Sequence, residues 1–503
     1  MRLACAITRG ELGLEAPEVN VEVCLSGGLP GLGIVGLAET TVKESRERVR
    51  AAIGQCGFEF PGRKIVVNLA PADLPKSGGR FDLAIAVGVL AASGQIRAAR
   101  LGGLELLGEL AFTGSLRPVT GLLPALLATR RAGRTAVVPA GCAAEAGLLR
   151  GADIRLADHL AAVLRFIQGD DTLPQPAAAG GGAAGAVEDL GDIHGQPLAK
   201  RALEIAAAGG HNILFVGPPG TGKSMLARRL PGLLPPMTEE EAVESAALGS
   251  LAGSPLPRAW AIRPFRAPHH TATTAALVGG GSWPRPGEIS LAHHGVLFLD
   301  ELPEFSRGTL EALREPLETG RIAVARAART LEFPARFQLV AAMNPCPCGF
   351  HGDPTRPCRC SPDQVRRYQE RLSGPFLDRL DIRLPVGRSA IQLVGSQAAG
   401  ATESSALVAA RVAAARVLQM RRAGKPNAAL APAEIREHCM PVAAGVGLLE
   451  SAAARLQLSH RACDSVLRLA RTVADLAATA EVSAAQVAEA LNLRNGCLRV
   501  GAG

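Results

Sequence analysis

One octapeptide of this sequence has the composition of a phosphate-binding loop. It reads Gly217, Pro218, Pro219, Gly220, Thr221, Gly222, Lys223, Ser224 and fits the pattern G-x-x-x-x-G-K-[ST]. Glycines let backbone N–H groups close around phosphate oxygens, and a following helix N-terminus adds partial positive charge. We therefore expect residues 217–224 to hold ATP, with Lys223 at the β- and γ-phosphates and Ser224 as a ligand of Mg²⁺.

A second stretch supplies the carboxylates that such a site needs. Residues 295–302 contain an apolar run that is typical of a core strand, and Asp300 and Glu301 stand at the C-terminal end of that run. Asp300 suits the Mg²⁺ shell, and Glu301 suits polarisation of the attacking water. An acidic pair on a surface loop is the plainer alternative. In the same chain as a phosphate loop, we interpret the pair as the second half of a nucleotide site.

Four of the 11 cysteines cluster between residues 346 and 360. Cys346 and Cys348 form one C-x-C pair, and Cys358 and Cys360 form another. Four thiolates could bind one Zn²⁺ tetrahedrally, although this spacing is tighter than the common C-x-x-C, and His351 could replace one ligand. Four reduced thiols in a loop, or an accidental redox pair, are the alternatives.

Several elements must position these residues. An apolar strand at 213–216 and a helix from 225 flank the glycine loop, and a helix at 192–203 precedes them. We expect a helix at 311–318, a β-hairpin at 321–333 and a core strand at 336–343 that ends at Asn344. Beyond about residue 390 the chain is helical, with helices at 459–477 and 483–494 that each open on a serine cap.

Residues 1–168 form a separate mixed α/β unit. Strands are expected at 19–25, 64–69 and 104–110, and helices at 41–56 and 82–92. The glycine-rich stretch 27–36 has no lysine at phosphate-loop spacing, so we predict no second nucleotide site there. The Ala/Gly/Pro-rich residues 169–187 are expected to be a flexible linker.

Composition limits the classes of partner. The formal net charge of +8 permits a polyanionic partner without demanding one, and 3% aromatic residues are too few for base stacking to dominate nucleic-acid contacts. No run of about 18 apolar residues and no signal peptide is evident, so we expect a cytoplasmic protein without a membrane span.

Taken together, these elements resemble the YifB/ComM family of AAA+ ATPases related to the magnesium-chelatase ATPase subunit. The resemblance covers nearly the whole chain. It includes blocks at residues 29–36, 42–52, 67–74, 263–271, 285–292 and 344–349, several of which are specific to that family. It implies a degenerate Lon-protease-like α+β domain at 1–168, an AAA+ α/β core with a parallel sheet at 188–388, and a helical lid at 389–503.

The resemblance also implies roles for further residues. Asn344 is similar to sensor 1, which orients water at the γ-phosphate. Arg379 resembles the arginine finger supplied to a neighbouring subunit, and Arg461 resembles a nucleotide-binding sensor 2 on the lid; a surface arginine is the alternative for each. Aligned with Lon proteases, Arg80 stands where the serine nucleophile should be and Leu123 lies near the lysine position. We therefore expect no protease activity, although Ser77 is a nearby hydroxyl.

Two basic segments are candidates for contact with a polymer. One is residues 263–270, with two arginines and two histidines; the other is the hairpin with Arg321, Arg326 and Arg329. Phosphate contacts need only basic side chains. A hydrogen-bonded structural pair is the alternative for the histidines, and a solvated face for the arginines. The pair His293-His294 is expected to be structural.

The primary interpretation is a Mg²⁺-dependent ATPase ring, a homo-hexamer by resemblance, that acts on branched or single-stranded DNA. Family members named ComM are implicated as branch-migration helicases in natural transformation, so recombination proteins are candidate partners. A protein-remodelling ATPase and a chelatase-type motor that drives metal insertion by a partner are the alternatives. ATPase activity rests on the residues, whereas DNA as substrate rests mostly on resemblance.

Overall fold

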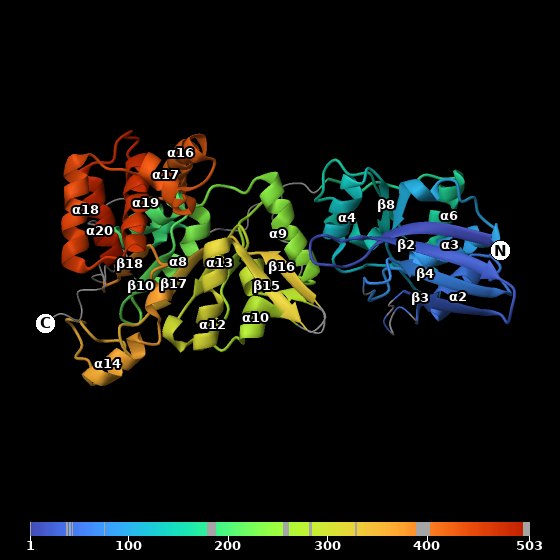
Figure 1. Cartoon of the computed structure of the whole chain (residues 1–503), viewed down its shortest axis with the longest axis horizontal. Coiled ribbons are helices and arrows are strands. Elements are labelled where there is room, and N and C mark those ends of the chain that lie inside the picture. The colour runs from blue at the N-terminus through green and yellow to red at the C-terminus, as the bar shows by residue number, and fades with distance from the viewer. Residues whose placement is uncertain are drawn as a thin grey trace. The chain divides into compact units, whose positions relative to one another are not determined.

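The computed structural model describes residues 2–36, 39, 42, 44–74, 76–178, 188–254, 261–280, 284–326, 329–388 and 403–495, without the side chains of 325, 326 and 329. The chain forms two compact units (Figure 1). The first comprises Met1–Ala183, Glu239–Trp260 and Ala327–Phe333; the second comprises Ala184–Thr238, Ala261–Arg326 and Pro334–Gly503. The expected fold class is confirmed, because both units are mixed α/β and the second contains a parallel sheet. The finer domain boundaries stay predictions.

A seven-stranded mixed sheet organises the first unit, in the order β3-β4-β2-β1-β5-β8-β9. Its strands are β1 (Arg2–Arg9), β2 (Glu18–Ser26), β3 (Gly31–Val35), β4 (Lys64–Ala70), β5 (Leu104–Leu106), β8 (Thr135–Pro139) and β9 (Ile154–Ala157). The strands predicted at 19–25 and 64–69 are confirmed. The single strand predicted at 104–110 is wrong: the Gly108 N–H donates to the Arg80 carbonyl, so the chain leaves the sheet. β6 (Glu109–Leu110) then pairs with β7 (Leu116–Arg117).

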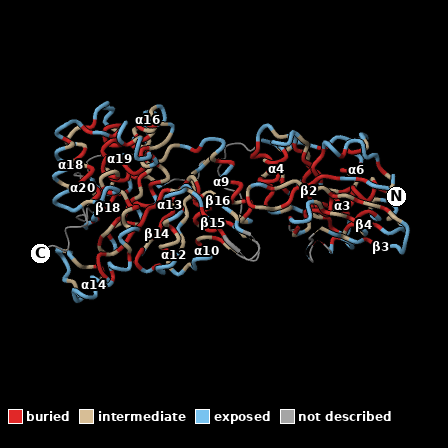
Figure 2. The backbone as a smooth tube through the Cα atoms, viewed as in Figure 1, coloured by how far each residue is buried: buried red, intermediate tan, exposed pale blue. Residues whose placement is uncertain are grey.

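Alternation along β2 builds the main core of this unit. Val19, Val21, Val23 and Leu25 all lie on one face and are buried, as the period of two requires. Figure 2 shows buried backbone in the region of β2 and α3. Helix α3 (Asp82–Ser93) packs against β1 and β2, and α2 (Ser45–Gln55) packs against α3. Both helices were predicted; residue 41, where the first was expected to begin, lies outside the described residues.

A helix from the middle of the chain completes a second core of the first unit. Helix α9 (Glu239–Leu251) packs against α4 (Leu122–Arg131) and buries Val243, Ala246 and Ala247 there. The Gly121 N–H donates to the Ser250 carbonyl at 3.2 Å, and the Leu123 N–H donates to the Ser250 hydroxyl at 3.4 Å. No pattern in the sequence indicates that residues 239–251, which follow the phosphate loop, belong to the first unit.

The second unit is built on a five-stranded parallel sheet in the order β11-β14-β17-β10-β18. Its strands are β11 (Phe265–Arg266), β14 (Val296–Leu299), β17 (Gln338–Met343), β10 (Ile213–Val216) and β18 (Ile382–Pro385). β10, the first in sequence, lies between the last two. The carboxyl ends of parallel strands share one edge, so the segments after β10, β14 and β17 meet there.

Two predicted helices of this unit begin or end elsewhere. The helix expected at 192–203 is α7 (Pro197–Gly209), since Pro197 fits the first helical turn and Asp192 ends a separate 3₁₀ turn. The helix expected at 311–318 splits into α12 (Arg307–Ala312) and α13 (Arg314–Thr319). Pro316 has no N–H to donate to the Ala312 carbonyl, which explains the break.

The C-terminal helices pack on the same unit (Figure 1). They are α16 (Ser405–Ala423), α17 (Pro432–His438), α18 (Ala443–Leu456), α19 (His460–Leu476) and α20 (Ala484–Asn495). The predicted Ser459 cap is confirmed, because its side chain accepts from the Ala462 N–H. Among the helices of the described residues, none combines the length and apolar character that a membrane crossing requires.

A buried polar group joins these helices to the sheet. His211, just before β10, contacts the Asp381 carboxylate at 3.4 Å and the Thr472 hydroxyl of α19 at 2.8 Å. Ser465 donates to the same carboxylate. Burial disfavours ionisation of Asp381, but the hydrogen bonds from His211 and Ser465 hold its pKa below the usual range. The lid helices are thus tied to the strand that leads into the phosphate loop.

Candidate nucleotide-binding site

The phosphate loop follows β10 and ends where α8 (Lys223–Arg229) begins. Gly220 and Gly222 have φ of 78° and 85°, a conformation that favours glycine, and an added Cβ at either would meet only open space. At Gly217 a Cβ would lie 2.1 Å from the Val386 carbonyl oxygen, so only glycine fits beside the end of β18. The loop is therefore an open cradle lined by backbone at a helix N-terminus, which fits a phosphate chain.

Lys223 folds back over this loop. Its ammonium donates to the carbonyl oxygens of Gly217 and Pro218 at 2.7 and 2.8 Å, and to the Asn344 side-chain oxygen at 3.2 Å. Burial lowers the pKa of Lys223, and the nearby carboxylates of Asp300 and Glu301 oppose that shift. The predicted residues Lys223 and Asn344 are thus brought together, at the carboxyl ends of adjacent strands β10 and β17.

The predicted Mg²⁺ ligands also meet. The Ser224 hydroxyl donates to an Asp300 carboxylate oxygen at 2.6 Å, and the other Asp300 oxygen accepts from the Glu301 N–H at 2.9 Å. A hydroxyl beside a carboxylate is the oxygen donor set that Mg²⁺ prefers, so the pair fits that ion. Glu301 has φ of 52°, and its side chain is 53% exposed. Its carboxylate lies 3.0 Å from His270 and takes no part in the pairing of Ser224 with Asp300.

The predicted arginine finger and sensor 2 converge on one acidic residue. Arg379 and Arg461 both lie 2.7 Å from the same carboxylate oxygen of Glu318. The hydrogen bond from Arg461, together with the charge of Arg379, holds the pKa of Glu318 below its usual range. Arg379 is 6% exposed and also donates to the carbonyls of Arg314 and Pro375. The sequence carried no signal for Glu318.

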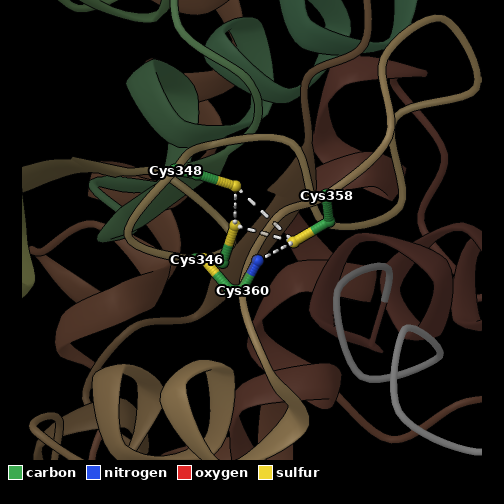
Figure 3. A group of neighbouring side chains, drawn as sticks. All are labelled: Cys346, Cys348, Cys358 and Cys360. Atoms are coloured by element: carbon green, nitrogen blue, oxygen red, sulfur yellow. Dashed lines mark hydrogen bonds between the residues drawn. The ribbon is translucent and has the colours of Figure 1, made fainter.

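The four clustered cysteines gather their sulfur atoms into one group (Figure 3). The Cys346 sulfur lies 3.4 Å from Cys348 and 3.6 Å from Cys358, and Cys348 lies 3.5 Å from Cys358. All four sulfurs lie within 4.8 Å of one another. His351 donates its backbone N–H to the Cys346 sulfur at 3.3 Å, and backbone N–H groups of the loop lower the pKa of Cys348 to about 6.

This loop packs on the phosphate loop. Gly349, with φ of 85°, faces Pro219, and a Cβ added at Gly349 would lie 2.6 Å from the Pro219 ring. The cysteine loop begins two residues after Asn344, and through Gly349 it contacts Pro219 of the predicted ATP-binding loop.

In the first candidate polymer-contacting segment, residues 263–270, both arginines form hydrogen bonds with other groups of the protein. Arg263 donates to the carbonyls of Pro235 and His294 at 2.6 and 2.7 Å, and Arg266 forms two hydrogen bonds of 2.6 Å with Glu288. This arrangement does not favour these two arginines as phosphate contacts. His293 accepts from the Arg336 N–H at 3.0 Å and is buried, which agrees with the expected structural role.

The second candidate segment forms the predicted hairpin. Strands β15 (Arg321–Arg326) and β16 (Arg329–Pro334) make a two-stranded sheet. The side chains of Arg326 and Arg329 lie outside the described residues, while Arg321 is exposed. The hairpin remains the candidate contact with a polyanion.

Comparison with known proteins finds relatives that match nearly the whole chain, two of which are described here. The chain is 51% identical to the uncharacterized protein YifB of Salmonella typhimurium over 496 residues, 98% of this chain and 97% of that protein. It is 49% identical to the competence protein ComM of Haemophilus influenzae over 503 residues, 98% of each. The chain belongs to the YifB/ComM family.

Family models divide this YifB/ComM-family chain into three matches. Residues 189–393 match "Magnesium chelatase, subunit ChlI", residues 21–141 match "Subunit ChlI of Mg-chelatase", and residues 402–494 match the C-terminal part of that subunit. A "Probable DNA helicase MCM9" of Arabidopsis thaliana is 27% identical over 177 residues, 35% of this chain and 22% of that protein. The protein is thus a magnesium-chelatase-like AAA+ protein.

In the Lon-like region of this YifB/ComM-family chain, the predicted nucleophile position is occupied by the side chain of Arg80. Arg80 is buried, donates to the Thr120 carbonyl and pairs with Glu11 at 3.2 Å. Burial lowers the pKa of Arg80, against the charge of Glu11. Leu123 is buried and Ser77 half-buried. A guanidinium held in this way can neither attack a carbonyl nor accept a proton from a serine.

Proposed function

We propose that this protein hydrolyses ATP with Mg²⁺ and uses the energy to move DNA, as a branch-migration helicase in recombination during natural transformation. The observation that carries the ATPase is the meeting of Lys223, Ser224, Asp300 and Asn344 at one edge of the parallel sheet. Residues 217–224 would hold ATP, and Ser224 with Asp300 would hold Mg²⁺, which shields phosphate charge when bound.

The chain's own residues then have distinct tasks. Lys223 would exchange its carbonyl partners for phosphate oxygens, and Asn344, already within reach of Lys223, would orient the attacking water. Glu301 would accept the proton of that water. Arg379 would leave Glu318 and act on the nucleotide of a neighbouring subunit, which makes hydrolysis depend on a homo-oligomeric ring, a hexamer by resemblance. Arg461 would leave Glu318 and contact the nucleotide as sensor 2 on the lid.

DNA as the substrate is supported by three features. A full-length relative is named a competence protein and a partial relative a probable DNA helicase. The chain carries a formal net charge of +8, and the hairpin of β15 and β16 has an exposed arginine at its start.

The first unit would serve as a non-proteolytic scaffold, because Arg80 occupies the position of the nucleophile.

The deciding experiment measures ATP hydrolysis with and without four-way junction DNA at two salt concentrations. We expect the junction to stimulate hydrolysis, the stimulation to fade at higher salt because phosphate contacts release counterions, and Lys223→Ala to abolish both rates. Hydrolysis that ignores every DNA but responds to an unfolded polypeptide would overturn the DNA motor in favour of a protein-remodelling ATPase. Activity dependent on a partner of the chelatase type would favour metal insertion.

We also propose that Cys346, Cys348, Cys358 and Cys360 bind one structural Zn²⁺. Zn–S bonds of about 2.3 Å in a tetrahedron place sulfurs ~3.8 Å apart, and three of the sulfur pairs lie at 3.4 to 3.6 Å. The ion would close the loop that carries Gly349 against Pro219 and so brace the ATP-binding loop.

Elemental analysis of the purified protein is expected to give one zinc per chain. Cys358→Ser should lose that zinc and bind ATP more weakly, because the loop against Pro219 loses its crosslink. Cys463→Ser, a half-buried thiol outside the cluster, should keep both properties. Wild-type protein without stoichiometric zinc would remove the ion from the proposal and leave the ATPase untouched.

A further inference from the structure

A surface pocket lies between the cysteine loop, residues 346–360, and the helix that follows it. Helix α14 (Pro362–Gln369) begins two residues after that loop, and Figure 1 shows it at the periphery of the second unit. The pocket has a volume of about 490 Å³, within the range of roughly 300–1,000 Å³ found for ligand sites. Its lining is rich in arginine and includes Cys348, Arg359, Cys360, Gln364, Arg367 and Arg371.

Helix α14 turns one uncompensated arginine toward this pocket. Gln364 and Arg367 are three positions apart, so both lie on the face of the helix that lines the pocket. Arg366 lies on another face, where it pairs with Asp363 at 2.7 Å and lies 3.9 Å from Glu370. Both carboxylates of this segment therefore serve Arg366, and neither offsets the charge of Arg367.

Two guanidinium groups of the pocket are available to a ligand. Arg359 and Arg367 are exposed, and neither pairs with a carboxylate among the residues that the structure describes. Arg371 differs, because it donates to the Pro303 carbonyl at 3.1 Å and to Glu304 at 3.0 Å and so forms a wall of the pocket. A guanidinium without an internal partner can donate two parallel N–H bonds to a phosphate group.

The composition of the pocket favours phosphate over a nucleic-acid base. Residues 356–371 contain five arginines and two acidic residues, so this short segment supplies +3 of the chain's formal net charge of +8. The aromatic ring of α14 does not offer a stacking surface, because Tyr368 is buried and the Arg371 guanidinium lies 6.0 Å from its ring centre. The pocket would therefore recognise backbone charge without regard to base sequence.

We propose that Arg359 and Arg367 bind the phosphodiester backbone of DNA, at a contact built from different elements than the hairpin of β15 and β16. The inference rests on the proposed action on DNA and adds a second binding surface to it. The loop that carries Arg359 also carries Gly349, which packs against Pro219 of the predicted ATP-binding loop. A change in the ATP-binding loop would therefore be transmitted to the bound DNA.

The test measures binding of fluorescent four-way junction DNA by anisotropy over a series of salt concentrations, with a non-hydrolysable ATP analogue present. We expect the double variant Arg359→Ala/Arg367→Ala to bind about 10-fold more weakly. The slope of log affinity against log salt should become shallower by about 2, because two phosphate contacts are lost. Arg366→Ala, the matched control on the other face of α14, should keep the wild-type Kd and slope.

Zinc content separates this role from a structural one, since both arginines also lie beside Cys348 and Cys360. A double variant with wild-type Kd and salt slope would overturn the proposal, whether or not it keeps zinc, and would leave the DNA motor intact. If binding weakens and zinc is lost as well, Arg367→Ala alone decides, because Arg367 lies outside the cysteine loop. A slope shallower by about 1 with zinc retained supports the phosphate contact, and any other result overturns it.

Failure of the proposed function has a different signature. Wild-type protein that binds junction DNA without hydrolysing ATP faster would contradict the DNA motor, while the binding assay would still decide the role of Arg359 and Arg367. Wild-type protein that binds no DNA would overturn both proposals.

Discussion

Glu301→Gln is expected to lower the kcat for ATP hydrolysis by about 100-fold or more while ATP binding survives. The amide keeps the size of the side chain but cannot accept the proton of the attacking water. Asp300 cannot replace it, because both of its oxygens already serve the Ser224 hydroxyl and the Glu301 N–H. Steady-state turnover and equilibrium binding of a fluorescent ATP analogue measure the two quantities separately.

Glu304→Gln is the matched control for this change. Glu304 lies three residues further along and its carboxylate accepts from Arg371 at 3.0 Å at the protein surface. We expect it to hydrolyse ATP at close to the wild-type rate. If Glu301→Gln retains more than about a third of wild-type kcat, general base catalysis by Glu301 is wrong.

Arg379→Ala is expected to reduce hydrolysis by about 1,000-fold, because an arginine finger stabilises the charge of the transition state. The decisive measurement mixes Arg379→Ala subunits with Glu301→Gln subunits. Each variant alone should be inactive. In a mixed ring, the intact Glu301 of one variant meets the intact Arg379 of the other, and part of the activity should return.

This mixing experiment separates catalysis from stability. Arg379 is buried and bonds Glu318 and two carbonyls, so its loss also removes structural contacts. A protein that merely unfolds would not recover activity on mixing. Arg371→Ala, which removes an arginine bound to the Pro303 carbonyl and Glu304, should stay active alone. Mixed rings that assemble and remain inactive would contradict a role for Arg379 across the interface.

Much of the fold follows from local pattern. The run 213–216 forms β10 as predicted, and the alternation at 19–25 forms β2, because side-chain period and residue type act over a few neighbours. The candidate site follows with one more step. Segments that follow parallel strands meet at one edge of the sheet, so the strand predictions alone favour a site that combines Lys223, Asp300 and Asn344.

The parts that sequence did not predict depend on distant contacts. Arg379 and Arg461 both pair with Glu318, and Arg461 is 143 positions from Glu318 in the sequence. Ion pairs over such a distance leave no periodic pattern in the sequence. The contact of His270 with Glu301 could not be predicted without knowing that β11 lies beside β14. β11 spans only residues 265–266, which is too short to be recognised as a strand from the sequence. The break at Pro316 had a local signal, the missing N–H, that the helix prediction passed over.

The placement of α9 sets a limit on how this chain can be divided. A cut within the predicted linker of 169–187 would leave α4 uncovered in one fragment and Val243, Ala246 and Ala247 exposed in the other. Neither piece would be a self-sufficient domain, because each would carry an apolar surface that the intact polypeptide hides. The C-terminal piece would keep a helix that belongs to the interior of the first unit, so the order of residues along the chain does not mark where that unit ends.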